Sequence, residues 1–173
     1  MPAPPPPDLA GRLGPLDAGD RSALLALACA AQEMVLRMDP AVADREGPPP
    51  DGDDPVGRAV RHRELALRVG RLLGEDGLRA LVERVREDVP EATDAFLERA
   101  GDEGGVLAFG ESRLGDPGDA VLFSDGLGCV GSSLAIFGGA GMMVLGMATE
   151  NTGAFAAGAV ILGVGIYGAA TFC

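Results

Sequence analysis

Three cysteines and one histidine are the residues of this sequence most capable of chemistry, and two of the cysteines are placed to react with each other. Cys129 stands at the start of one long uncharged segment and Cys173 at the end of the next. In an antiparallel hairpin both thiols would lie at the same end, where a disulfide would close a loop of about 45 residues. That bond would persist only in an oxidising compartment. Two free thiols near a membrane surface are the alternative.

The other residues with chemical potential do not combine into a catalytic, metal or cofactor site. His62 stands between Arg61 and Arg63, a pattern typical of a solvated helix face. Three scattered cysteines and one histidine lack the spacing of a zinc site. The motif GxGxxG occurs at 126–131 and again at 163–168, as expected by chance in a glycine-rich tract. We therefore expect no enzyme activity and no cofactor.

Gly104 and Gly105 form a candidate double-glycine processing site. Glu98 has the offset that such a leader requires. Against this hypothesis, Arg99 and Asp102 occupy positions where such leaders usually carry apolar residues.

Charge is distributed very unevenly along the chain. The sequence has 26 acidic and 14 basic side chains, all of the latter arginine, and a formal net charge of -12. Residues 119–173 carry only Asp119, Asp125 and Glu150, and no base. A net negative chain cannot displace counterions from nucleic-acid phosphates, so nucleic acid is not an expected partner. The asymmetry predicts two physical environments within one chain.

The hydrophobic periodicity and the positions of proline and glycine predict an all-α chain in four parts. Residues 1–21 are expected to be a disordered proline-rich tail. Residues 22–105 should form short amphipathic helices, interrupted by a proline- and aspartate-rich linker at 39–53. Residues 106–126 are predicted to be a second linker. Residues 127–173 are predicted to form a hydrophobic, glycine-rich helical hairpin.

The hairpin prediction rests on two uncharged segments, 127–148 and 154–173, separated by a polar turn. As helices they would be about 33 and 30 Å long, which matches a hydrocarbon core of about 30 Å. The rest of the chain is too small to bury two such helices easily, which favours insertion into a bilayer. A buried pair in a soluble fold and an aggregation-prone β-rich segment are the alternatives.

Small residues are spaced so that the two helices can approach closely. Gly131, Ala135 and Gly139 recur every four residues, and Gly165 and Ala169 form a shorter strip on the second helix. This small-xxx-small pattern is typical of membrane helix packing. It predicts contact within one hairpin or, alternatively, a homo-oligomer through the glycine faces.

These features predict a small, non-enzymatic integral membrane protein of bacterial type. The hairpin would anchor or oligomerise in the lipid bilayer, and the acidic helical region would be a cytoplasmic interaction module, since every arginine precedes the hairpin. The alternative is a precursor whose segment from about residue 106–126 to Cys173 is released as a secreted, membrane-active, bacteriocin-like peptide, the N-terminal region being its leader. A holin-like pore subunit is a third hypothesis.

Overall fold

Every element that the structure describes is a helix. The structure is a computed structural model that describes residues 7–37, 55–115 and 127–173. Within these ranges it contains no strand, which confirms the all-α prediction. The elements are α1 (Leu9–Arg12), α2 (Ala18–Arg37), α4 (Pro55–Arg84), the 3₁₀ turn η1 (Val85–Glu87), α5 (Pro90–Asp102), α6 (Val106–Leu114), α7 (Leu127–Ala148) and α8 (Thr152–Phe172).

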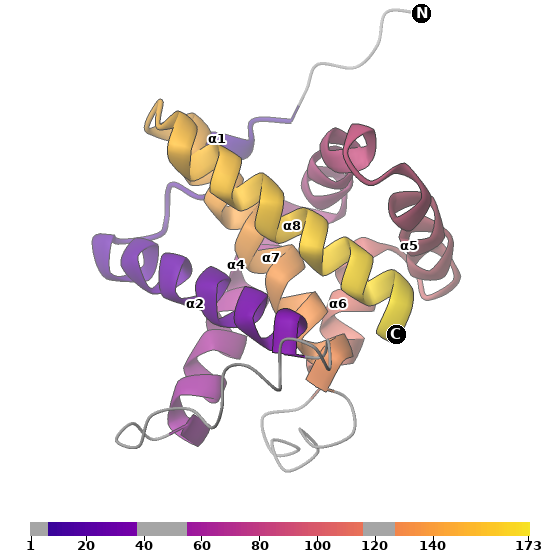
Figure 1. Cartoon of the computed structure of the whole chain (residues 1–173). Coiled ribbons are helices and arrows are strands. Elements are labelled where there is room, and N and C mark those ends of the chain that lie inside the picture. Colours follow the sequence, from indigo (N-terminus) through magenta and orange to yellow (C-terminus); the bar gives the residue numbers. More distant parts are fainter. Residues whose placement is uncertain (1–6, 38–54, 116–126) are drawn as a thin grey trace, which may run out of the picture.

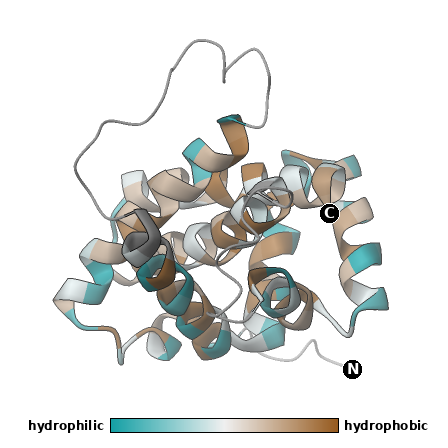
Figure 2. Ribbon diagram, turned by 90° about the horizontal axis from the view of Figure 1, so that it is seen from below, coloured by the Kyte–Doolittle hydropathy of each residue, from teal (hydrophilic) through white to brown (hydrophobic). Residues whose placement is uncertain are grey.

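Helix α7 is the central element of the bundle. It lies antiparallel to α8 and also contacts α2, α4 and α6 (Figure 1). Coloured by hydropathy, the ribbon is hydrophobic toward the middle of the bundle and hydrophilic mainly on the outer helices (Figure 2). Because α7 has no charged residue, it can occupy this position without burying an unpaired ion.

Helix α4 bends at Gly74, whose backbone angles are φ 71° and ψ 175°. A positive φ is accessible to glycine at little cost, so the break occurs where the sequence has this residue. Arg12 binds the bend from outside, donating hydrogen bonds to the carbonyl oxygen of Leu73 and to the carboxylate of Asp76. Glu75 lies just past the bend and accepts hydrogen bonds from the backbone N–H groups of Val106 and Leu107, at 2.9 and 2.8 Å.

The Arg12–Asp76 pair gives the bend a defined dependence on pH. The hydrogen bond from Arg12 is the main reason why the pKa of Asp76 falls from 3.8 to about 2. A carboxylate with a lower pKa in the folded state stabilises that state above pH 4, and the contribution is lost as the pH falls from about 4 through about 2. The effect should be small, because 63% of the Asp76 side chain is exposed. We expect Asp76→Asn to be less stable than the parent at pH 6, with a difference that shrinks as the pH approaches 2 and vanishes below it, as measured by urea unfolding.

Two predictions of organisation are wrong in part. The linker predicted at 106–126 contains helix α6, Val106–Leu114, whose N-terminal N–H groups are capped by Glu75 from α4. The tail predicted to be disordered over 1–21 contains α1, and its Leu13 and Leu16 are buried in the core. Both errors have one cause. The segments are held in place by contacts with residues that are distant in sequence. Residues 1–6, the predicted linker 39–53 and the remainder of 106–126 after residue 115 lie outside the described ranges.

Candidate functional site

The C-terminal hairpin, defined here as α7, α8 and Cys173, is the feature with the clearest functional content. Two of its segments, Gly128–Ala148 and Thr152–Phe172, are each long and apolar enough to cross a membrane. The turn between them places Glu150 at a positive φ of 52°, and the side chain of Asn151 caps α8 by accepting a hydrogen bond from Ala154 N at 3.0 Å. Helix α7 has the predicted bounds, whereas α8 begins two residues earlier than predicted.

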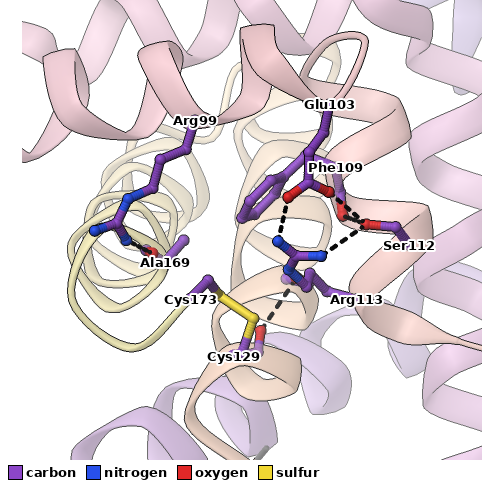
Figure 3. A network of polar contacts seen from close by, with 9 residues as sticks. Arg99, Glu103, Phe109, Ser112, Arg113, Cys129, Ala169 and Cys173 are labelled. Atoms are coloured by element: carbon purple, nitrogen blue, oxygen red, sulfur yellow. Dashed lines mark hydrogen bonds and ion pairs between the residues drawn. A yellow bond between two sulfur atoms is a disulfide. The ribbon is translucent and has the colours of Figure 1, made fainter.

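A disulfide joins the two ends of the hairpin. The structure links Cys129 to Cys173, with their Cα atoms 5.0 Å apart (Figure 3). Close to this bond, the Arg99 guanidinium of α5 donates a hydrogen bond to the carbonyl oxygen of Ala169 at 3.1 Å. The open end of the hairpin is therefore closed covalently and also tied to α5.

A second polar group lies on the other side of the disulfide, on α6. Arg113 pairs with Glu103 and lies over the ring of Phe109, 4.8 Å from its centroid (Figure 3). Ser112 donates a further hydrogen bond to Glu103 at 3.0 Å. These residues hold α6 against the end of α5, which keeps both helices beside the open end of the hairpin.

Four glycines let the backbones of α7 and α8 touch. A Cβ atom at Gly139 would lie 2.5 Å from Leu162 N, and one at Gly158 would lie 2.5 Å from Met143 N. Gly146 meets the backbone of Phe155 in the same way, and a Cβ at Gly165 would lie 2.8 Å from Ile136 N. Real Cβ atoms do not approach backbone this closely, so the hairpin in this form requires glycine at these positions, Gly139, Gly146, Gly158 and Gly165.

The predicted packing residues divide between two interfaces. Gly139, Ala135 and Gly165 lie between α7 and α8, since a Cβ at Gly165 would be 2.9 Å from that of Ala135. Gly131 instead faces α2, where a Cβ would lie 3.1 Å from Met34 Cβ. Ala169 is fully buried and offers its carbonyl oxygen to Arg99.

Sequence reasoning missed Gly146 and Gly158, although a signal was present. Gly139 and Gly146 are seven residues apart, and so are Gly158 and Gly165. A spacing of seven keeps residues on one side of two helices that coil around each other with a left-handed twist. A four-residue spacing of small residues describes a right-handed crossing, and it points to Gly131 in place of Gly146.

Three helices enclose α7 on the sides that α8 leaves open; we call α2, α4 and α6 the cover. Along α2, a Cβ at Gly138 would lie 3.4 Å from Ala28 Cα. On the α4 and α6 side, the Phe137 ring fits between Gly70 and Gly110, and a Cβ at Gly70 would lie 3.0 Å from the ring. As a result, 83% of the apolar segment of α7 is buried inside the structure, compared with 39% of that of α8.

Exposed hydrophobic surface is concentrated on two neighbouring helices. Among the described residues, all of the exposed large hydrophobic side chains belong to α2 or α8. Val160 is 58% exposed and Tyr167 57%. These two helices contact each other, and Gly168 of α8 packs on Val35 of α2. We use the name apolar face for the exposed large hydrophobic residues of these two helices, which are Leu25, Leu36, Val160, Tyr167 and Phe172.

The remaining candidate residues lie away from the hairpin. His62 is partly exposed on α4, and Cys29 is a free, exposed thiol on α2. Gly104 and Gly105 form the turn between α5 and α6, both with positive φ. Gly104 is exposed, but Gly105 is buried under Glu75, whose carboxylate carbon would lie 2.6 Å from an added Cβ.

Comparison with known proteins adds no assignment. No family model, curated protein or solved structure matches this chain. Within the described ranges, no group of three or more histidine, cysteine or acidic side chains is arranged to hold a metal ion.

Proposed function

We propose that this chain is a non-enzymatic membrane protein that holds a membrane-inserting hairpin in a covered form. The observation that carries the proposal is the unequal burial of two helices with the same apolar character. Helix α8 already presents an uncharged face to the surroundings, while α7 is enclosed by the cover. The exposed face of α8 would meet the bilayer first, and α7 would follow when the cover separates.

The dimensions and the composition of α8 support a lipid surface as its partner. Its 21 residues would extend about 31 Å, close to the thickness of a hydrocarbon core. It contains no charged residue, so its insertion requires no ion to be dehydrated. Tyr167 adds an aromatic side chain with one polar atom, a type common at membrane surfaces.

The cover cannot accompany α7 into hydrocarbon in its present arrangement. Its outer surface carries ion pairs such as Arg68–Asp20 and Arg71–Glu111, at 2.5 and 2.7 Å. Moving a charged side chain from water to the bilayer centre costs at least about 2.5 to 3.5 kcal/mol. Separation of the cover from α7 is therefore the step that would commit the hairpin to the membrane. The glycines between α7 and α8 are already used within the hairpin, so a homo-oligomer would need another surface.

The test locks the cover to α7 with a second disulfide. In a Cys29→Ser background, Met34→Cys with Gly131→Cys brings together two Cβ positions 3.1 Å apart, near the range that a disulfide spans. Met34→Ser with Gly131→Ser is the matched control, because it has the same size changes and cannot form the bond. Peptide mapping would verify the new pairing, and flotation with phosphatidylcholine vesicles would measure membrane binding.

We expect the control to float with the vesicles in a form that resists carbonate extraction, and the locked variant to remain extractable. Equal, extraction-resistant binding by both proteins would show that the cover need not open. Absence of both proteins from the floating fraction would contradict the membrane proposal itself.

The disulfide favours one alternative, a secreted membrane-active peptide. Cys129 and Cys173 lie at the hairpin end that is joined to the N-terminal region, so both would be on the same side of a membrane. A persistent disulfide requires an oxidising compartment, and this conflicts with a cytoplasmic N-terminal region. After a cut in the segment 106–126, the bond would still hold the released hairpin closed. Intact mass of the membrane fraction and of the medium would distinguish the two candidates. A full-length membrane species supports the anchored protein, and a released fragment about 2 Da lighter than its reduced form supports the peptide.

A further inference from the structure

A cleft lined mainly by residues of α4 is charged, unlike the apolar face. One of its arginines, Arg63, has no counterion among the described residues. The cleft has a volume of about 560 Å³, and its charged lining residues are Arg63, Glu64, Arg68 and Arg71. Arg68 and Arg71 pair with Asp20 and Glu111, respectively. Arg63 has no such partner among the described residues.

Arg63 is only 4% exposed, and two of its nitrogens are buried without a hydrogen-bond partner in the part of the chain described here. Arginine stays protonated in proteins, so this group cannot avoid the cost of burial by losing its charge. A buried charge is normally paired and hydrogen-bonded. The site is thus chemically incomplete until it receives an anion.

The geometry of the unpartnered atoms identifies the kind of anion. They are Nε and Nη2, which form the side-on edge of the guanidinium group. Both atoms are covered by neighbouring atoms in this structure, so the guanidinium has to turn toward the cleft before this edge can bind an anion. The edge then offers two parallel N–H donors, which match two oxygen atoms of a phosphate or carboxylate group. Arg68 uses Nη1 and Arg71 uses Nε in their ion pairs, so each keeps further N–H groups for a third oxygen. Donors from three arginines suit a tetrahedral phosphate better than a planar carboxylate.

We infer that the cleft beside Arg63 binds a phosphate group. Two sources share this chemistry, namely the phosphodiester of an anionic lipid headgroup and soluble phosphate. The inference does not depend on the membrane proposal, because a soluble phosphate can occupy the cleft of the closed chain.

The first experiment measures the thermal unfolding of the full chain as inorganic phosphate is added, with sodium chloride of equal ionic strength as the screening control. The variants are Arg63→Met, which removes the charge at similar size, and Arg79→Met, which makes the same change at an exposed arginine elsewhere on α4. We expect phosphate to raise the unfolding temperature of the parent and of Arg79→Met with saturation. In Arg63→Met the affinity should fall about tenfold or more, because a charge-assisted hydrogen-bond pair is lost.

Arg63→Met also has a distinctive expected behaviour without phosphate. Since it replaces an unpaired buried charge by an apolar side chain, it should be at least as stable as the parent. A site that exists only to support the fold would lose stability on this change. An equal temperature shift from chloride, or an equal response to phosphate in Arg63→Met and the parent, would overturn the inference.

A second arm separates the two sources. Flotation compares vesicles of phosphatidylcholine alone with vesicles that also contain phosphatidylglycerol. If the lipid headgroup is the source, the parent prefers the anionic vesicles, free phosphate competes for this preference, and Arg63→Met lacks it. If soluble phosphate is the source, the thermal shift is present while Arg63→Met and the parent bind both vesicle types alike.

Discussion

Gly139→Ala is expected to lower the free energy of unfolding by about 3 kcal/mol, at the upper end of the usual cost of overpacking a core. The added Cβ would lie 2.5 Å from Leu162 N and 2.9 Å from Gly158 O, and both of these are backbone atoms. A side chain can rotate away from a new methyl group, but here the whole of α8 would have to move. Denaturant unfolding followed by circular dichroism measures the change.

The chain supplies a matched control in the same hairpin. Gly163 lies in α8 as well, and an added Cβ there would meet no atom within 4 Å. Gly163→Ala should therefore leave stability unchanged or raise it by up to about 1 kcal/mol, the helix-propensity difference between the two residues. If both variants lost the same free energy, helix propensity or an altered unfolded state would be the cause, and the close contact of α7 with α8 would be contradicted.

Loss of the disulfide is expected to have the largest effect on the hairpin. Cys129 and Cys173 are separated by 44 positions, and closing a loop of that length stabilises the folded chain by about 4 kcal/mol on the chain-entropy estimate. Replacing both residues by serine, or adding a reductant to the parent, should lower the free energy of unfolding by this amount. Urea titrations with and without the reductant would measure it.

Cys29→Ser serves as the control, because Cys29 is an exposed free thiol. Its stability should match that of the parent and should remain sensitive to reductant. The free energy of unfolding of the variant lacking Cys129 and Cys173 should not change when the reductant is added. Equal stability of that variant and the oxidised parent would argue that the covalent closure contributes nothing to the fold.

The hairpin was the part of the fold most accessible to sequence reasoning. Absence of charge over 22 residues sets the ends of α7, and the polar turn around Glu150 separates it from α8. The placement of Cys129 and Cys173 at one end follows from antiparallel geometry alone. These features are local, or they follow from simple symmetry, so no knowledge of other contacts was needed.

The features that sequence reasoning missed all depend on partners distant in the chain. Helix α6 is short and follows a glycine-rich turn, and its N-terminus is capped by Glu75, some 30 positions earlier. The enclosure of α7 depends on Phe137 fitting against Gly70 and Gly110, three residues with no local pattern in common. The incomplete pairing of Arg63 depends on which of several arginines the fold buries. Hydrophobic periodicity describes only one element at a time, so it cannot predict these contacts between elements.

The cap on α6 has a kinetic consequence for any protease that recognises the two glycines before it. Gly105 is buried, and Glu75 binds the N–H groups immediately after it, so the peptide bond is not presented in the closed chain. Proteases act on extended segments that have left their native contacts. When such opening is fast and reversible, cleavage proceeds in proportion to the population of open molecules. The carboxylate of Glu75 would then set the rate at which the chain is cut, by controlling how often the bond becomes available.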